Sequence, residues 1–131
     1  CDRLMTQYSN QIQECRGCGA HHGIYIKKKS LFENFLKLLP TSMTKDENFV
    51  SKLIVAAITD WLFKKYKILV ILERAEVALI FSPSLIITEK EIHYFFDSLE
   101  NTLKEGIWKI TRKFVTKQFS GHINPNFKDE L

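Results

Sequence analysis

The sequence predicts an α+β fold, in which a small antiparallel or mixed sheet carries helices packed on one face. Two pairs of short segments, each pair joined by a turn-like connection, indicate strands at residues 12–16, 23–27, 68–72 and 77–81. Two longer segments, residues 46–66 and 89–105, carry apolar residues at helical spacing. A length of 131 residues and a hydrophobic fraction of 45% suit one domain with a real core.

The first third of the chain is expected to form a helix end followed by two strands. Residues 4–10 are predicted as the end of a helix, and residues 12–16 and 23–27 as a hairpin-like pair. Glycines between these two strands suit a tight connection with close backbone approach. Residues 32–39 are predicted as a short amphipathic helix, which Pro40 ends because proline cannot continue a helix.

The middle of the chain is predicted to form a long helix and a second pair of strands. Thr44 or Asp46 is expected to cap the helix over residues 46–66. Its apolar face carries Val50, Leu53, Ile54, Ala57, Ile58, Trp61 and Leu62. Residues 68–72 and 77–81 then form strands on either side of a charged turn.

The segment from Ser82 to Gly106 predicts a strand end, a proline turn and a capped helix. Pro83 fixes its own φ and keeps Ser82 extended. Thr88 and Glu91 have the spacing of a capping box, so the helix should begin at residue 89. An apolar stripe follows at i, i+3, i+4, i+7 and i+11, formed by Ile92, Phe95, Phe96, Leu99 and Leu103. Gly106 stands where a C′ glycine would end the helix.

The last part of the chain is predicted as a basic-aromatic tail. Residues 107–118 mix aromatic and apolar residues with Lys and Arg, which predicts another amphipathic helix. Residues 119–131 are expected to be irregular, with a turn at Asn124-Pro125-Asn126. The chain is therefore divided into a domain over residues 1–106 and a tail over residues 107–131.

Two segments carry a resemblance to a known enzyme family. Residues 82–92, S-P-S-L-I-I-T-E-K-E-I, resemble the S-P-P-L-I-I-T-E-E-E-I segment of class III aminotransferases, which use pyridoxal phosphate. Ser82, Pro83 and Thr88 match, and Ser84 replaces the second proline. Residues 14–26 are similar to the family's E-V-R-G-x-G-x-x-x-G-I-x-L segment. The matching residues there are Arg16, Gly17, Gly19 and Gly23.

The resemblance implies the small C-terminal domain of such an aminotransferase, similar to the small domain of fold-type I pyridoxal-phosphate enzymes. In the whole enzyme, an amino group would pass from an amino acid or an ω-amine to a keto acid. The family's catalytic lysine, pyridine-nitrogen aspartate and phosphate loop belong to a large domain that precedes this segment, and nothing here corresponds to them. We therefore expect no catalytic residue in this chain, pyridoxal phosphate only in the intact homodimeric enzyme, and no activity without the large domain.

Arg74 is the residue that the resemblance suggests for substrate binding. An arginine near this place could form a bidentate pair with a substrate carboxylate, which lysine cannot match. The plainer interpretation is an exposed arginine in a turn between Glu73 and Glu76. Many members that act on amino acids carry arginine at the position of Ile80. Its absence here slightly favours donors such as ω-amines.

A cluster of metal-ligating residue types overlaps the glycine-rich segment. Cys15, Cys18, His21 and His22 offer four ligands of the kind that zinc prefers. The spacing is compressed, and neighbouring strand residues point to opposite faces. We therefore expect no metal, and keep a small zinc-binding domain as an alternative. A redox pair at Cys15 and Cys18 is disfavoured because Gly17 and Gly19 argue against the helix start that such a pair needs.

Charge and composition set the expected partners. The net charge of +4 comes from scattered lysines and short basic runs, without an aromatic RNA-binding motif, so nucleic acid is not expected. No apolar run has the length of a membrane span. The expected partners are the large cofactor domain or a second copy. The alternative is a non-enzymatic interaction module that docks through the basic-aromatic tail.

The cysteines and the ends of the chain bear on its compartment. Three cysteines, an odd number, argue against a disulfide framework and favour a reducing, cytoplasmic location. Because the chain opens with Cys1, we expect a processed or fragmentary form. Lys128, Asp129, Glu130 and Leu131 spell an ER-retention signal, which leaves the ER lumen as a minor alternative.

Overall fold

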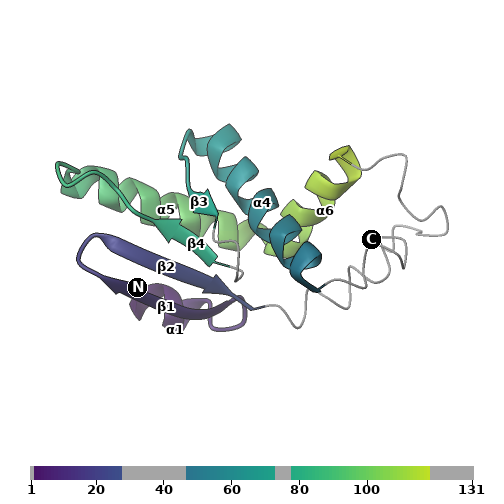
Figure 1. Cartoon of the computed structure of the whole chain (residues 1–131), viewed down its shortest axis with the longest axis horizontal. Coiled ribbons are helices and arrows are strands. Elements are labelled where there is room, and N and C mark those ends of the chain that lie inside the picture. The colour runs from purple at the N-terminus through teal and green to yellow at the C-terminus, as the bar shows by residue number, and fades with distance from the viewer. Residues whose placement is uncertain (1, 28–46, 73–77, 119–131) are drawn as a thin grey trace.

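The computed structural model describes residues 2–27, 47–72 and 78–118 (Figure 1). Predictions for the helix over residues 32–39, for Arg74 and for residues 119–131 fall outside these ranges. The elements in chain order are α1 (Asp2–Gln7), β1 (Ile12–Cys18), β2 (His21–Ile26), α4 (Glu47–Tyr66), β3 (Ile71–Leu72), β4 (Ala78–Phe81), α5 (Glu89–Glu105) and α6 (Ile107–Gln118). The predicted α+β class is confirmed.

The sheet has the strand order β1-β2-β4-β3, and every neighbouring pair is antiparallel. β2 and β4 pair through His22 with Phe81 and Ile24 with Leu79. The pairing of β1 with β2 shifts register between Ile12 and Glu14, which marks a bulge at the start of the hairpin. The sheet is therefore antiparallel rather than mixed.

One hydrophobic core joins the sheet to the helices. Alternate residues of β2 and β4 point to the same face, so Ile24, Ile26, Leu79 and Phe81 meet the helices. Phe81 stacks on Phe95 of α5, with ring centroids 4.1 Å apart. The same core also takes in Leu4 of α1 and Tyr8 directly after it, Val50, Ile54, Ile58 and Leu62 of α4, Leu99 and Leu103 of α5, and Ile107 and Val115 of α6. Thus α6 packs into the folded unit rather than standing apart from it.

The start and end of α5 have the predicted chemistry. Thr88 is the N-cap, and its Oγ1 accepts a hydrogen bond from the Glu91 backbone N–H at 3.3 Å. The Glu91 carboxylate in turn accepts from the Thr88 backbone N–H at 2.8 Å, which completes the capping box. Gly106 ends the helix at φ 89°, and its N–H donates to the Leu103 carbonyl at 3.1 Å. Both predictions are confirmed.

The end of α4 is closed by a residue in the left-handed region. Lys67 has φ 59°, its N–H donates to the Phe63 carbonyl at 3.0 Å, and the Ile68 N–H donates to the Leu62 carbonyl at 3.3 Å. The bond from the Lys67 N–H to the Phe63 carbonyl is that of an αL motif, in which glycine usually occupies the position of Lys67. The chain can therefore turn directly from α4 toward β3.

The predicted strand over residues 68–72 is wrong in its first part, since β3 contains only Ile71 and Leu72. Ile71 pairs with Ile80, so continuing the register would place Ile68 opposite Pro83. Proline has no N–H to donate to a ladder. The pairing therefore could not reach Ile68, but the ladder already ends at Ile71, before the proline is met. In contrast, β1 and β2 extend farther toward their shared turn than predicted.

Candidate functional site

The hairpin formed by β1 and β2 shows why glycine stands at two of its positions. Gly19 lies in the turn at φ 59°, where a side chain would strain the backbone. Gly17 lies opposite His22, and a Cβ there would come within 2.5 Å of the His21 carbonyl oxygen. The glycines that carry the family resemblance are therefore required by the local geometry.

Arg16 lies on the face of the hairpin that turns away from the helices. Its guanidinium carbon is 4.7 Å from the centre of the Tyr25 ring, and its Nε donates to Glu14 Oε1 at 2.5 Å. The ring of Tyr25 lies beside Gly23, where a Cβ would approach it to 3.0 Å. Arg16 thus holds the outer face of the hairpin through an ion pair and a cation–π contact.

Pairing of β2 with β4 places the first resembling segment beside the strand that leads directly into the second. Gly23 pairs with Ile80 and His22 pairs with Phe81, although these residues lie almost sixty positions apart in the sequence. Phe81 is followed directly by Ser82 and Pro83, and Thr88 then caps α5. The glycine turn and the start of α5 consequently lie toward the same end of the sheet (Figure 1).

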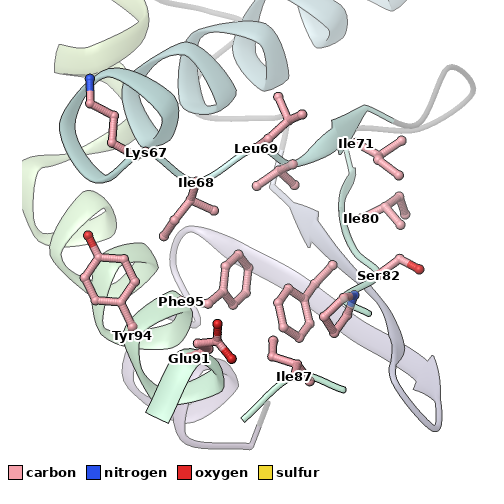
Figure 2. Close-up of a pocket in the computed structure, with 13 residues that line it drawn as sticks. Lys67, Ile68, Leu69, Ile71, Ile80, Ser82, Ile87, Glu91, Tyr94 and Phe95 are labelled. Atoms are coloured by element: carbon pink, nitrogen blue, oxygen red, sulfur yellow. The ribbon is translucent and has the colours of Figure 1, made fainter. Parts of the chain in front are cut away.

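A groove of about 440 Å³ opens beside this junction, where the ladder between β3 and β4 ends (Figure 2). One wall is the extended segment from Lys67 to Ile71, and the other runs from Ile80 to Pro83. Ile87, Glu91, Tyr94 and Phe95 complete the lining from the start of α5. We call this hollow the edge groove. Most of its lining side chains are apolar, so it favours an apolar occupant.

Three polar side chains that line the edge groove, those of Lys67, Glu91 and Tyr94, have hydrogen-bond partners within the chain. Hydrogen bonds from the Thr88 backbone and side chain lower the pKa of Glu91 and keep its carboxylate on the helix cap. The Tyr94 hydroxyl donates to the Tyr66 carbonyl at 3.0 Å. Lys67 Nζ donates to the Lys64 carbonyl at 3.4 Å, and its side chain points away from the groove (Figure 2). The described lining therefore does not fit a phosphate-bearing cofactor, which needs several donors directed at one anion.

The residues that the resemblance singled out differ in where they lie relative to the edge groove. Arg74 lies outside the described residues. Ile80, the residue found where many relatives of the suggested family have arginine, lines the edge groove. Ser82 and Pro83 also line this groove, whereas Thr88 serves the helix cap. The resemblance did not predict this apolar groove. Two features of the sequence were signals for it: Pro83, which cannot donate to a strand ladder, and the uncharged run over residues 68–72.

The four metal candidates do not form a ligand set in the part of the chain that the structure describes. Cys15 takes part in a disulfide bond, so its sulfur is not available as a thiolate. Cys18 is a free, exposed cysteine. The His22 ring lies 2.8 Å from the Gly19 carbonyl oxygen through Nε2. The odd cysteine number therefore does not exclude a disulfide bond at Cys15, and the cysteine count alone does not indicate the compartment.

A buried carboxylate joins the first helix to α5, which the sequence analysis did not foresee. Glu100 is only 7% exposed, and it contacts Arg3 and Tyr8 of the α1 region and Lys104 of its own helix. Hydrogen bonds from Arg3 and then Lys104 lower the pKa of Glu100. Burial raises the pKa of Tyr8, with Glu100 adding to the effect. None of these residues lines the edge groove, and their contacts join α5 to the first helix, so we assign this cluster to the stability of the fold.

No protein-family model matches this chain, and no curated protein resembles it closely enough to be matched. Among the described helices, none combines the length and the apolar character that crossing a membrane requires.

Proposed function

We propose that this chain is the small domain of a pyridoxal-phosphate-dependent aminotransferase, which acts together with a large domain that holds the cofactor. The observation that supports this proposal is the pairing of β2 with β4, because β2 belongs to the first resembling segment and β4 leads directly into the second. If the two resemblances were chance, there would be no reason to expect the two segments to lie close together in space. Here the second segment begins directly after the strand that neighbours β2, and it continues to the cap of α5.

The residues where β2, β4 and α5 meet indicate which part of the work belongs to this domain and which to the large domain. Gly17 and Gly19 allow the hairpin to turn, and Thr88 fixes the start of α5 after Pro83. These residues hold the shape of the domain and have no role in bond making. When bound to the large domain, pyridoxal phosphate supplies the electron sink for amino transfer. The edge groove does not fit that cofactor, so this chain's part is to shape and cover the substrate site.

Arg74 is the residue of this chain that we assign to substrate binding. It follows β3 and precedes β4 in the sequence. Its guanidinium would pair with the substrate carboxylate through two parallel hydrogen bonds, which fixes the orientation of the amino acid. Lysine retains the positive charge but cannot form the two parallel hydrogen bonds. The Arg74→Lys variant therefore distinguishes orientation of the substrate carboxylate from simple charge attraction to it.

The test begins with the native protein in its source, detected with an antibody raised against this chain. We expect a band far heavier than 15.3 kDa, and the protein captured from it should contain pyridoxal phosphate and show transaminase activity. In that polypeptide, Arg74→Ala and Arg74→Lys should raise KM for the amino donor, while Lys90→Ala on the exposed side of α5 should not. A native band at 15.3 kDa, or a heavier protein without the cofactor, would refute the proposal.

A second candidate is an interaction module that docks through the basic residues of α6. The observation that favours it is the placement of Trp61 between two lysines, with Lys65 Nζ at 5.2 Å and Lys113 Nζ at 5.6 Å from its ring. Ile107, Ile110 and Val115 are buried, so docking would use only the outer, charged side of α6. Reversing the charge at Lys113 should then abolish capture of an acidic partner without unfolding the chain, whereas unchanged capture would exclude this candidate.

A further inference from the structure

A polar hollow lies where the end of α4, the end of α5 and the start of α6 meet. Its volume of about 510 Å³ is within the range of small-molecule sites in proteins. Each of the three helices contributes one lysine to the lining. The lining residues are Lys65 and Tyr66 of α4, Asn101, Lys104 and Glu105 of α5, and Lys109 of α6. We call this site the lysine hollow, and it shares no lining residue with the edge groove.

Two of the lysines converge on one carboxylate. Lys65 Nζ lies 3.6 Å from Glu105 Oε1, and Lys109 Nζ lies 3.0 Å from Glu105 Oε2. The hydrogen bond from Lys109 is the main cause that lowers the pKa of Glu105, and the charge of Lys65 adds to the effect. One ionised carboxylate therefore holds two ammonium groups, which come from different helices, at one place in the hollow.

The charges of the lining do not cancel. Three lysines and one glutamate line the hollow, which leaves an excess of two positive charges. Lys104 contacts Glu100, which Arg3 also contacts, so Lys104 is engaged in the fold and adds charge rather than a free donor. Helix α6 contains no acidic residue and extends the positive charge beyond the hollow with Arg112, Lys113 and Lys117. The hollow therefore favours an anionic ligand.

We propose that the lysine hollow binds a phosphate-bearing small molecule, whose phosphate is held by Lys65 and Lys109. A phosphate monoester carries a charge of about −1.5 to −2 at neutral pH and has three strong acceptor oxygens, so it matches the excess charge of the lining. Each lysine ammonium has three donors on a flexible side chain, so both can turn from Glu105 to a ligand. The side chains of Lys65 and Lys109 are 42% and 54% exposed and can be reached from solvent.

Glu105 is the internal competitor of this ligand. Its carboxylate occupies the place between the two ammonium groups, but it brings one negative charge where a phosphate brings nearly two. Removing the charge of Glu105 should consequently tighten phosphate binding, whereas removing either lysine should weaken it. A diffuse attraction to the basic surface would not distinguish these positions from other charged residues of the chain.

The lysine hollow is separate from both functions proposed above. In the aminotransferase proposal the large domain holds the cofactor, and Lys113, which the docking proposal uses, does not line the hollow. Binding at the hollow can therefore be measured on the 131-residue chain alone, without cofactor, large domain or protein partner. A failure here leaves those two proposals standing.

The experiment titrates glycerol phosphate into the 131-residue chain and follows proton–nitrogen correlation NMR spectra. We expect saturable shifts at residues 65 and 101–109, and binding of succinate, a dicarboxylate of similar charge, at least about threefold weaker at equal ionic strength. Lys65→Gln and Lys109→Gln should each raise the dissociation constant about fivefold or more, because each removes a charge-assisted hydrogen bond. Lys65→Arg should retain binding, and Glu105→Gln should lower the dissociation constant.

Two matched controls make the same charge changes away from the hollow. Lys52→Gln alters an exposed position of α4, and Glu89→Gln alters the exposed first turn of α5. Both should leave the dissociation constant within about twofold, because exposed charges more distant than the Debye length are screened.

Several outcomes would overturn the proposal. Shifts that do not saturate, shifts that lie elsewhere, equal binding of succinate, or equal weakening by Lys65→Gln and Lys52→Gln would each contradict it. Weaker binding by Glu105→Gln would also contradict it, since the carboxylate would then not compete with the ligand. Because both lysines are about half exposed, their variants should keep the melting temperature of wild type. If Lys65→Gln unfolds the chain, Lys109→Gln makes the same comparison from α6, and unchanged binding in that variant would refute the site.

Discussion

Replacing Lys67 with glycine is expected to stabilise this chain, although the change removes a whole side chain. Lys67 adopts φ 59° after the last turn of α4, in the position that αL motifs at helix ends usually give to glycine. A residue with a Cβ is strained there, whereas glycine is not. The expected gain therefore comes from the folded backbone and not from any new contact.

The size of the effect follows from three contributions. Relief of the left-handed conformation contributes about 1–2 kcal/mol. Glycine loses more conformational freedom on folding, which costs about 0.5–1 kcal/mol. The lost Lys67 contacts are a 3.4 Å hydrogen bond to the Lys64 carbonyl and a 6.0 Å approach to the Phe63 ring, both exposed. The loss of these two contacts costs about 0.5 kcal/mol at most. The net expectation is a gain of about 0.5 kcal/mol in the free energy of unfolding.

The control is the same substitution three residues earlier. Lys64 lies inside α4, where its Nζ contacts Asp60 at 2.6 Å. Lys64→Gly should cost about 1 kcal/mol, because glycine disfavours the helix and the ion pair is lost. Urea unfolding at a concentration where wild type and both variants are in the same oligomeric state measures the two changes. Destabilisation by Lys67→Gly equal to that by Lys64→Gly would refute the reasoning, since it would mean that the left-handed conformation carries no strain.

Three further changes test other parts of the structure. Thr88→Ala should cost about 1 kcal/mol of stability through the lost helix cap, and Thr88→Ser should restore most of it; equal loss in both variants would contradict the cap. Phe95→Ala should cost about 3–5 kcal/mol, because it empties the stack against Phe81 under the edge groove; a loss within the range of surface substitutions would show that this stack is not part of the core. The pKa of Glu100 is lower in the folded chain than in the unfolded chain. Its ionised carboxylate therefore contributes to the free energy of unfolding above the unfolded pKa, and this contribution is lost as the pH falls through the folded pKa. The melting temperature of wild type should therefore exceed that of Glu100→Gln at neutral pH and approach it in acid, and a difference independent of pH would exclude this ionic contribution.

Local chemistry made part of the fold predictable from the sequence. The cap formed by Thr88 and Glu91, and the helix end at Gly106, involve residues only a few positions apart. Their spacing alone therefore fixed the bounds of α5. The hydrophobic stripe of the same helix predicted its buried face for the same reason.

Interactions between distant residues were not predictable in this way. Glu100 meets Arg3 across 97 positions, and charged residues in a helical pattern normally indicate a solvated face. The ladder between β3 and β4 ends at Ile71 rather than at residue 68. The edge groove opens where this ladder ends. The sequence predicted a strand over residues 68–72, but the pairing with β4 was needed to show that only residues 71 and 72 belong to it.

The motif residues of the chain differ in what they say about function. The geometry of this domain explains three of them, Gly17, Gly19 and Thr88. Their presence is therefore evidence about the fold rather than about an activity. Leu85 and Ile86 are different, since they match the family segment and yet are 94% and 88% exposed. No buried contact of this domain accounts for these two apolar side chains. Their match to the segment is therefore the part of the resemblance that indicates contact with a surface outside the chain.

This distinction gives a last prediction. Replacing Leu85 and Ile86 together with serine should change the free energy of unfolding of the monomer by less than about 0.5 kcal/mol per site, because neither side chain is buried. The same pair of changes should weaken association with that outside surface, measured in a longer native polypeptide as the fraction that keeps its cofactor. The matched control is Thr88→Ser, which lies next to the turn and leaves its apolar surface intact. If the double variant unfolds the monomer but leaves association unchanged, these side chains serve this domain's own stability, and the argument from exposed motif residues fails.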